Sequence, residues 1–186
     1  MSAFEFVFSL FGLLLGLSLA EVLGGFGRTL QRRRKLHVGW LTPLLGLVVM
    51  LDVASFWLVA WAVRDAIPLA YFPMLCGLLI CGLYYLAATL AAPHELDEWP
   101  DLDLYYFEHR RLVIGGVLLC NALAIGALLT LGVNPLASGF TRATVTIFLG
   151  SAAAAMLLRG PRANAAILAF MALQYPVSSY LRLVGW

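Results

Sequence analysis

The stretch GWLTPLLGLVVMLDVASFWLVAWAV, residues 39–63, decides the fold class of this chain. It is long and apolar enough to cross a lipid bilayer as one helix, because a hydrocarbon core about 30 Å thick needs about 20 apolar residues. One carboxylate, Asp52, lies near its middle. An acid at the centre of a membrane helix costs about 2.5–3.5 kcal/mol, so its side chain normally faces protein or water and not lipid. The stretch therefore predicts a membrane protein with polar groups inside its bundle.

The composition of the chain agrees with this prediction. Of its 186 residues, 62% are hydrophobic and 12% are charged, whereas soluble domains average about 25% charged residues. The three cysteines lie in apolar runs without a CxxC spacing, which favours packing roles. No basic segment precedes the first apolar run, so we expect that run to remain as a helix and not to be removed as a signal peptide.

Six apolar runs are long enough to cross the membrane, and they predict an all-α bundle of six transmembrane helices in one domain, residues 1–186. The longest connection reads PHELDEWPDLDLYYFEHRR and is predicted to be a cytoplasmic loop, residues 93–111. Helices one to three and four to six run in opposite directions, as in inverted repeats, but their sequences leave such a repeat open. The predicted spans are residues 6–27, 39–63, 68–92, 112–133, 141–158 and 163–184.

The basic residues of the connections predict the orientation of the bundle. Loops on the cytoplasmic side of a membrane protein carry an excess of Lys and Arg. With both termini outside, nine basic residues fall on the inner side and three on the outer side, so we expect an N-out and C-out topology. The inner group is Arg28, Arg32, Arg33, Arg34, Lys35, Arg110, Arg111, Arg159 and Arg162, and the outer group is Arg64, Arg142 and Arg182.

Four polar side chains on four different predicted helices define a candidate interior layer: Asp52, Glu21, Asn121 and Gln174. At a rise of 1.5 Å per residue they lie between about 10 and 20 Å from the cytoplasmic end of the bundle. No Lys or Arg is predicted at that depth, so neither acid is expected to have a basic partner. The acids are then either protonated or reached by water or a cation.

Three interpretations of this layer remain open. Protonated carboxyls and amides can hydrogen-bond across helices and hold the bundle together. Alternatively, Asp52 and Glu21 relay protons or coordinate a cation along a conduction path, with Asn121 and Gln174 lining it. In the third interpretation the layer is a pocket for a lipid-like ligand whose polar end the two amides orient.

Small residues at four-residue spacing mark one face of the first predicted helix. Such faces allow close approach of a second backbone. The pattern is compatible with packing inside the bundle and with contact between protomers of an oligomer. The residues are Gly12, Gly16, Ala20 and Gly24.

The inner face combines a basic cluster with histidines and carboxylates. The basic cluster, Arg32, Arg33, Arg34 and Lys35, lies where anionic lipid head groups are expected, and each basic residue there contributes about 1 kcal/mol. His94 and His109 are weak candidates for a metal site, because no spacing matches a known ligand set. No nucleotide-binding motif is present, and no cofactor or nucleic-acid partner is expected.

The segment FGLLLGLSLAEVLGGFGRTLQRRRKLHVGWLTPLLGLVVMLDVASFW, together with YYFEHRR, resembles a family of small bacterial inner-membrane proteins. These proteins share a glycine-rich first helix, a basic loop, a Trp-led second helix and a tyrosine–arginine entry to the fourth. The resemblance implies a bacterial origin, location in the inner membrane and six-helix topology. It implies no activity, and no functional residue is carried over.

The sequence thus predicts a multi-pass protein that conducts protons or cations in a channel-like or transporter-like manner, in contact with membrane lipids and assembled as a homo-oligomer. A non-catalytic accessory subunit of a larger membrane complex is the alternative. A metal-dependent enzyme acting on lipids at the inner face is the third, and an enzyme is the less favoured class.

Overall fold

The computed structural model describes residues 3–34, 38–68 and 70–184 of the chain. Within these residues it is all-helical, as predicted, with two short 3-10 helices in the connections, η1 (Arg64–Ala66) and η2 (Leu96–Glu98). The α-helices are α1 (Ala3–Arg32), α2 (Leu41–Ala62), α3 (Tyr71–Thr89), α4 (Leu102–Thr130), α5 (Gly139–Leu157) and α6 (Pro161–Leu183).

Five of these helices, α1 to α5, are long and apolar enough to cross a membrane, which fits a multi-pass membrane protein. α6 has the length but is not one of the five. It contains Asn164, Gln174, Ser178 and Ser179 among its apolar residues, and these polar side chains lower its hydropathy. The fifth predicted span, the shortest of the six, is among the five.

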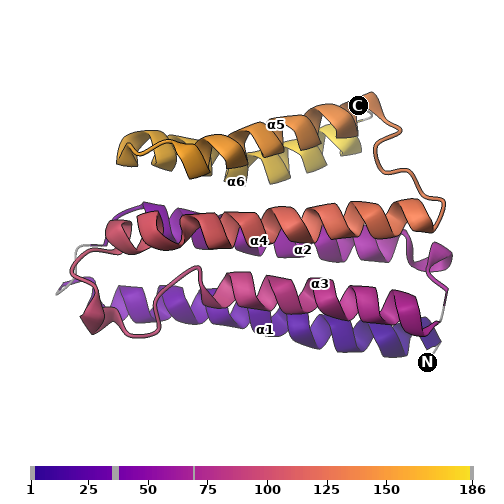
Figure 1. Cartoon of the computed structure of the whole chain (residues 1–186), viewed down its shortest axis with the longest axis horizontal. Helices are drawn as coiled ribbons and strands as arrows, with labels where there is room; N and C mark the ends of the chain where they lie inside the picture. Colours follow the sequence, from indigo (N-terminus) through magenta and orange to yellow (C-terminus); the bar gives the residue numbers. More distant parts are fainter. Residues whose placement is uncertain (1–2, 35–37, 69, 185–186) are drawn as a thin grey trace.

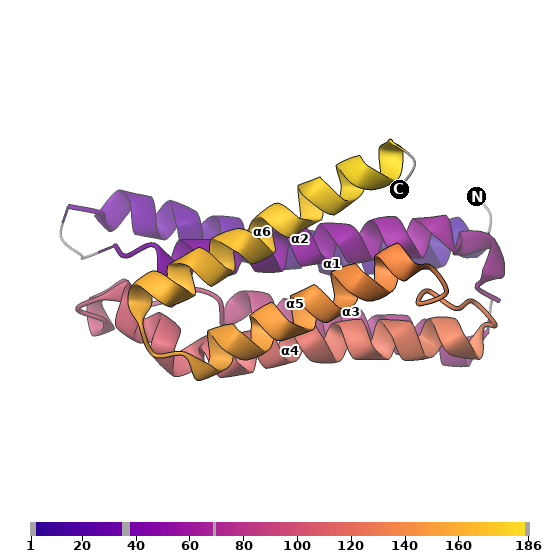
Figure 2. The same cartoon turned by 90° about the horizontal axis from the view of Figure 1, so that it is seen from above.

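The helices form three layers of two (Figure 1). The middle layer, α2 and α4, contacts the α1–α3 layer on one side and the α5–α6 layer on the other. Figure 2 shows that α5 and α6 run diagonally across α2 and α4, whereas the other four helices are nearly parallel. The α5–α6 layer meets the rest of the bundle mainly through α2 with α6 and α4 with α5.

The two ends of the bundle differ in charge. One end, which we call the terminal end, holds both ends of the described chain and the α2–α3 and α4–α5 connections (Figure 1). The other, the basic end, holds the α1–α2, α3–α4 and α5–α6 connections. In the sequence, the nine basic residues predicted to be cytoplasmic all fall in or beside these three connections. One of them, Lys35, lies outside the described residues.

α4 begins at Leu102, ten residues before the predicted start. The Asp101 side chain accepts a hydrogen bond of 2.8 Å from the backbone N–H of Asp103, as an N-cap residue does. The first turns of the helix are packed against the bundle, since Tyr106 is fully buried and Tyr105 nearly so. The predicted loop 93–111 is therefore half helix, and its two tyrosines face protein instead of lipid head groups.

α4 ends in a glycine C-cap. Gly132 has a φ of +75°, a left-handed conformation that glycine adopts without a Cβ penalty. The N–H of Val133 donates to the carbonyl of Leu128 at 3.0 Å, and that of Gly132 donates to Leu129 at 3.1 Å. This pair of bonds is the Schellman motif, which satisfies the last carbonyls of a helix. It turns the chain toward α5 at the terminal end.

The small-residue face predicted on the first helix is not the buried face of α1. A Cβ on Gly12 would lie 2.4 Å from the Trp57 ring, so this one position does pack closely against α2. Gly16 and Ala20, by contrast, are exposed, and nothing lies within 4 Å of a Cβ on Gly16. The buried face of α1 is a different stripe: Leu15, Ser18, Val22, Gly25 and Thr29.

Two glycines of α1 are expected to respond oppositely to replacement by alanine. A Cβ on Gly25 would lie 2.7 Å from the Cβ of Ala92, so Gly25→Ala overpacks the contact and is expected to lower the free energy of unfolding by about 1–3 kcal/mol. Gly16→Ala meets no atom and is expected to raise it by about 0.5–1 kcal/mol through helix propensity. Denaturant unfolding of both variants in micelles measures the difference, and equal effects would contradict this packing.

Candidate functional site

Asp52, near the middle of α2, accepts hydrogen bonds from three other helices. The hydroxyl of Tyr84 on α3 donates to Oδ2 at 2.8 Å, and Nδ2 of Asn121 on α4 donates to the same oxygen at 2.8 Å. The hydroxyl of Tyr175 on α6 donates to Oδ1 at 2.7 Å. The predicted proximity of Asp52 and Asn121 is therefore present, and two tyrosines complete a cluster that joins all three layers.

The donors around Asp52 are all neutral. The residue is 4% exposed, and among the described residues no Lys, Arg or His forms an ion pair with it. A carboxylate offers about four lone-pair sites, and the three donors fill three of them. Hydrogen bonds from neutral donors to a charged acceptor are stronger than neutral pairs, but they do not cancel its charge. The site can therefore still take up a proton or a cation.

A cavity of about 310 Å³ adjoins this carboxylate. Its walls come from α2, α4, α5 and α6, with Tyr84 of α3 at its base. From Asp52 it extends past Thr144 and Ser178 to Pro135 and Arg182, which lie at the terminal end of the bundle. Asp52 is thus buried in the bundle and yet lies on the wall of an open cavity.

Toward the basic end the same helices are packed tightly. Val49 of α2, Val117 of α4 and Leu168 of α6 are at most 2% exposed, and Ala152 of α5 is fully buried. These residues belong to one continuous hydrophobic core. The cavity therefore ends near Asp52 on this side and extends from there toward the terminal end.

Gln174 lines the same cavity, one residue before Tyr175. Its Nε2 donates to the backbone carbonyl of Thr144 at 2.6 Å, which links α6 to α5. Its Oε1 is buried and accepts no hydrogen bond from the described residues. Pro176 follows within α6 without interrupting the helix. The structure thus brings Asp52, Asn121 and Gln174 to one cavity, as the depth estimate predicted.

Glu21 does not belong to this site. Its Oε1 lies 3.3 Å from Nη2 of Arg28 and 3.6 Å from Nδ1 of His94. The prediction that Glu21 lacks a basic partner is therefore wrong. Arg28 is two turns further along α1, and its long side chain reaches back over the helix surface. Glu21 is part of a charged cluster that connects α1 to the segment after α3.

The remaining inner-face candidates lie apart from one another. His109 stacks on Tyr105 with ring centroids 4.1 Å apart, and His94 is the partner of Glu21. Among the described residues, no group of three or more His, Cys, Asp or Glu is arranged to hold a metal ion. Of the predicted lipid-binding residues, Arg32 pairs with Asp97, Arg33 and Arg34 are exposed, and Lys35 lies outside the described residues.

A second buried polar cluster, at the basic end, was not predicted. Arg110 of α4 is 4% exposed and donates from Nη1 to the carbonyl of Ala155 at 2.8 Å, to that of Leu158, and to Oδ1 of Asn164 at 3.1 Å. Asn164 also accepts from the Tyr106 hydroxyl at 2.7 Å. Arg110 thus binds the unpaired carbonyls at the end of α5, where the helix dipole favours a cation. We call these residues the Arg110 cluster.

Two adjacent residues of α6 provide a test of the cavity. Ser178 lines it, whereas Val177 is 53% exposed on the outer surface of the helix. If water fills the cavity, a Ser178→Cys variant is expected to react with a charged, membrane-impermeant thiol reagent at least about tenfold faster than Val177→Cys, because thiolates form in water and not in lipid. Mass spectrometry of labelled proteoliposomes measures both rates over the background of the native cysteines. Equal rates would contradict an aqueous cavity.

Comparison of the chain with known proteins gives no relative. No protein-family model, no curated protein and no solved structure matches it. The chemistry of the Asp52 cavity is therefore what indicates function.

Proposed function

We propose that this protein is a transporter-like conductor of protons or cations, with Asp52 as the carboxylate that binds them. One observation carries the proposal: Asp52 lies deep among apolar helices, without a basic partner among the described residues, on the wall of a cavity that reaches one end of the bundle. Ionisable groups at membrane depth that face a cavity typically mark ion or proton pathways.

The surroundings of Asp52 support a role in binding protons or cations better than a purely structural role. A carboxyl that only joins helices is best placed in a sealed, fully satisfied network, because a buried charge without a partner is destabilising. Here Asp52 keeps one acceptor site beyond its three donors and borders a space large enough for several water molecules. Its ligand can therefore enter and leave.

The tight packing on the basic side of Asp52 favours a transporter-like cycle over an open pore. A proton or cation that reaches Asp52 from the terminal end meets the buried core formed by Val49, Val117 and Leu168. Passage to the other side requires these helices to separate. In this cycle the α5–α6 layer moves against α2 and α4. Its movement breaks the bond from Tyr175 to Asp52 at mid-depth and the bonds of Arg110 at the basic end, so these contacts hold the closed state.

This cycle assigns different roles to the predicted polar residues. Tyr84, Asn121 and Tyr175 hold the carboxylate, and Gln174 lines the approach to it. Glu21 takes no part in the path, because its ion pair with Arg28 places it in another cluster.

The proposal includes a location and an orientation. We place the protein in the inner membrane of a bacterium, N-out and C-out, so that the basic end faces the cytoplasm and the anionic lipids of that leaflet. The Asp52 cavity then opens to the outside. Arg33 and Arg34, which are exposed, are the proposed contacts with lipid head groups.

A second candidate function is that of an accessory subunit in a larger membrane complex, or of a protomer in a homo-oligomer. The exposed Gly16 and Ala20 favour such an assembly, because small exposed residues on α1 allow the backbone of another helix to approach closely. Isolation in mild detergent separates the two cases. A stable complex with a different protein would support the subunit, and a lone homo-oligomer would support a self-contained conductor.

Flux into proteoliposomes tests the leading proposal. Vesicles that contain the wild-type protein are expected to dissipate an imposed pH, Na⁺ or K⁺ gradient faster than protein-free vesicles and faster than vesicles with the Asp52→Asn variant. If wild-type vesicles dissipate none of these gradients faster than protein-free ones, the proposal is wrong.

A further inference from the structure

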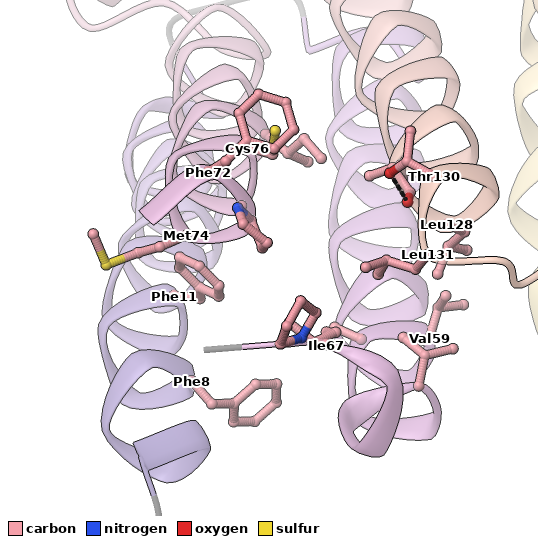
Figure 3. A pocket seen from close by; sticks show the side chains of 18 of the residues that line it. Phe8, Phe11, Val59, Ile67, Phe72, Met74, Cys76, Leu128, Thr130 and Leu131 are labelled. Carbon is pink, nitrogen blue, oxygen red and sulfur yellow. Dashed lines mark hydrogen bonds between the residues drawn. The ribbon is translucent and has the colours of Figure 1, made fainter. Parts of the chain in front are cut away.

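A second cavity of about 140 Å³ lies near the terminal end, between α1, α2, α3 and α4 (Figure 3). Phe8, Phe11 and Phe72 point into it from one side, and Val59 and Leu131 from the other. The Thr130 hydroxyl on its wall is occupied, since it donates to the carbonyl of Ala127 at 2.7 Å. Its wall is almost entirely apolar, and its volume is close to that of an apolar cavity that accepts benzene.

The two cavities share a wall. Phe56 and Val59 of α2 and Ala124 and Leu128 of α4 line both of them. The Phe56 ring lies 5.4 Å from the ring of Tyr84, whose hydroxyl donates to Asp52. Phe56 therefore lies between the apolar cavity and the space beside the carboxylate.

The chemistry of this pair of cavities distinguishes between classes of cation. Small hard cations bind through several oxygens, six in the case of Mg²⁺ and six to eight in that of Ca²⁺. The Asp52 cavity offers one carboxylate and several neutral oxygens, such as those of Thr144, Gln174 and Ser178, and aromatic and aliphatic side chains form most of its wall. A single charged ligand is fewer than the sites for these divalent ions use. An organic ammonium needs only one carboxylate and is attracted to aromatic rings, and three aromatic residues beside Asp52 line this cavity: Tyr84, Tyr175 and Phe148.

We propose that the site takes a lipophilic organic ammonium ion, with the charged nitrogen on Asp52 and an aromatic or short alkyl tail in the apolar cavity behind Phe56. This inference rests on the proposed function and names its substrate class. The volume of the Asp52 cavity lies at the lower end of the about 300–1,000 Å³ typical of small-molecule sites. The bound ammonium replaces the proton on Asp52, so the two compete.

One other charge faces the cavity. Arg182 lines its mouth, two turns of α6 or about 10 Å beyond Tyr175. It is exposed, contacts Thr141 at 3.4 Å, and lies over the Phe140 ring. At that distance and exposure, water and salt screen its repulsion of an entering cation.

Competition between two amines tests the proposal. Both 4-phenylbutylamine and n-butylamine are charged at neutral pH, as lysine is, and only the first carries a ring for the apolar cavity. In detergent-solubilised wild-type protein, 4-phenylbutylamine is expected to bind at least about tenfold more tightly than n-butylamine. Isothermal titration measures both, and Asp52→Asn is expected to remove saturable binding of either.

A variant that fills only the apolar cavity provides the control. Ala127 lines that cavity and not the one beside Asp52, so Ala127→Leu is expected to abolish the preference for the phenyl tail and to leave n-butylamine binding and proton flux unchanged. Equal affinities of the wild type for the two amines, or 4-phenylbutylamine binding that survives Asp52→Asn, would overturn the inference. If the amines bind alike while Asp52→Asn still stops proton flux, the substrate class is wrong and the proposed function stands.

Discussion

The Asp52→Asn variant is expected to slow proton or cation flux about 100-fold or more. A positioned group that exchanges protons contributes about 10²–10⁴-fold to a rate, and asparagine can neither release a proton nor carry the charge that binds a cation. Its side chain has nearly the same shape. Its oxygen can still accept from Tyr84 and Asn121 at the position of Oδ2, and its NH2 then faces the Tyr175 hydroxyl, which can turn to accept. Initial rates of gradient dissipation in proteoliposomes with matched protein content measure the effect.

Two further variants test whether the loss of flux is specific to the carboxyl of Asp52. Glu21→Gln removes the other acid within an apolar run, but Glu21 lies in a separate cluster with Arg28 and His94, so flux is expected to remain within about twofold of wild type. Asp52→Glu retains an ionisable carboxyl and is expected to retain measurable flux. Wild-type flux in a folded Asp52→Asn variant, judged by helicity and elution in detergent, would exclude Asp52 from the path.

The Arg110→Ala variant is expected to lower the free energy of unfolding by about 1–3 kcal/mol. Arg110 is almost fully buried and donates to two carbonyls at the end of α5 and to the Asn164 side chain. Its guanidinium also lies 4.8 Å from the centre of the Phe107 ring. Removing it takes the donor from the buried Ala155 carbonyl, whereas the Leu158 carbonyl keeps its bond from Asn164 and the Asn164 side chain keeps its bond from Tyr106. The loss of the Ala155 bond and of the buried packing is more damaging than the loss of an exposed ion pair.

Arg111 is the matched control. It is the next residue of α4 and is exposed, so Arg111→Ala is expected to change the free energy of unfolding by no more than about 0.5 kcal/mol. Denaturant titration of both variants in the same micelles provides the comparison. Equal losses would mean that the buried position of Arg110 does not contribute to stability.

The position of a residue along its helix predicts its depth in the bundle, but not which side chains it contacts. Counting residues from the cytoplasmic end placed Asp52, Asn121 and Gln174 at similar levels, and all three line one cavity. The same count grouped Glu21 with them, because it ignores how far a side chain extends. Arg28 spans two turns of α1 and binds Glu21, so the acid belongs to the surface cluster.

The residues missing from the predicted site share a physical reason. Tyr84 and Tyr175 lie in apolar runs, where a tyrosine is expected to pack as a large hydrophobic residue. The sequence does not show which group its hydroxyl will bind. Arg110 reads as a marker of the membrane surface, because a basic residue beside an apolar run normally is one. Its burial depends on α5 ending nearby with free carbonyls, and a sequence does not reveal which helix end will lie there.

The arrangement of the layers also bears on how the protein is built during synthesis. Asp52 enters the membrane with α2, and its first two donors follow on α3 and α4. These helices can therefore shelter one carboxylate oxygen while the chain is still being made. The other oxygen receives its donor, Tyr175, only when α6 has followed them. Until then α6 does not pack against the side of α2 that carries Asp52, so docking of α5 and α6 completes the hydrogen bonds of the site.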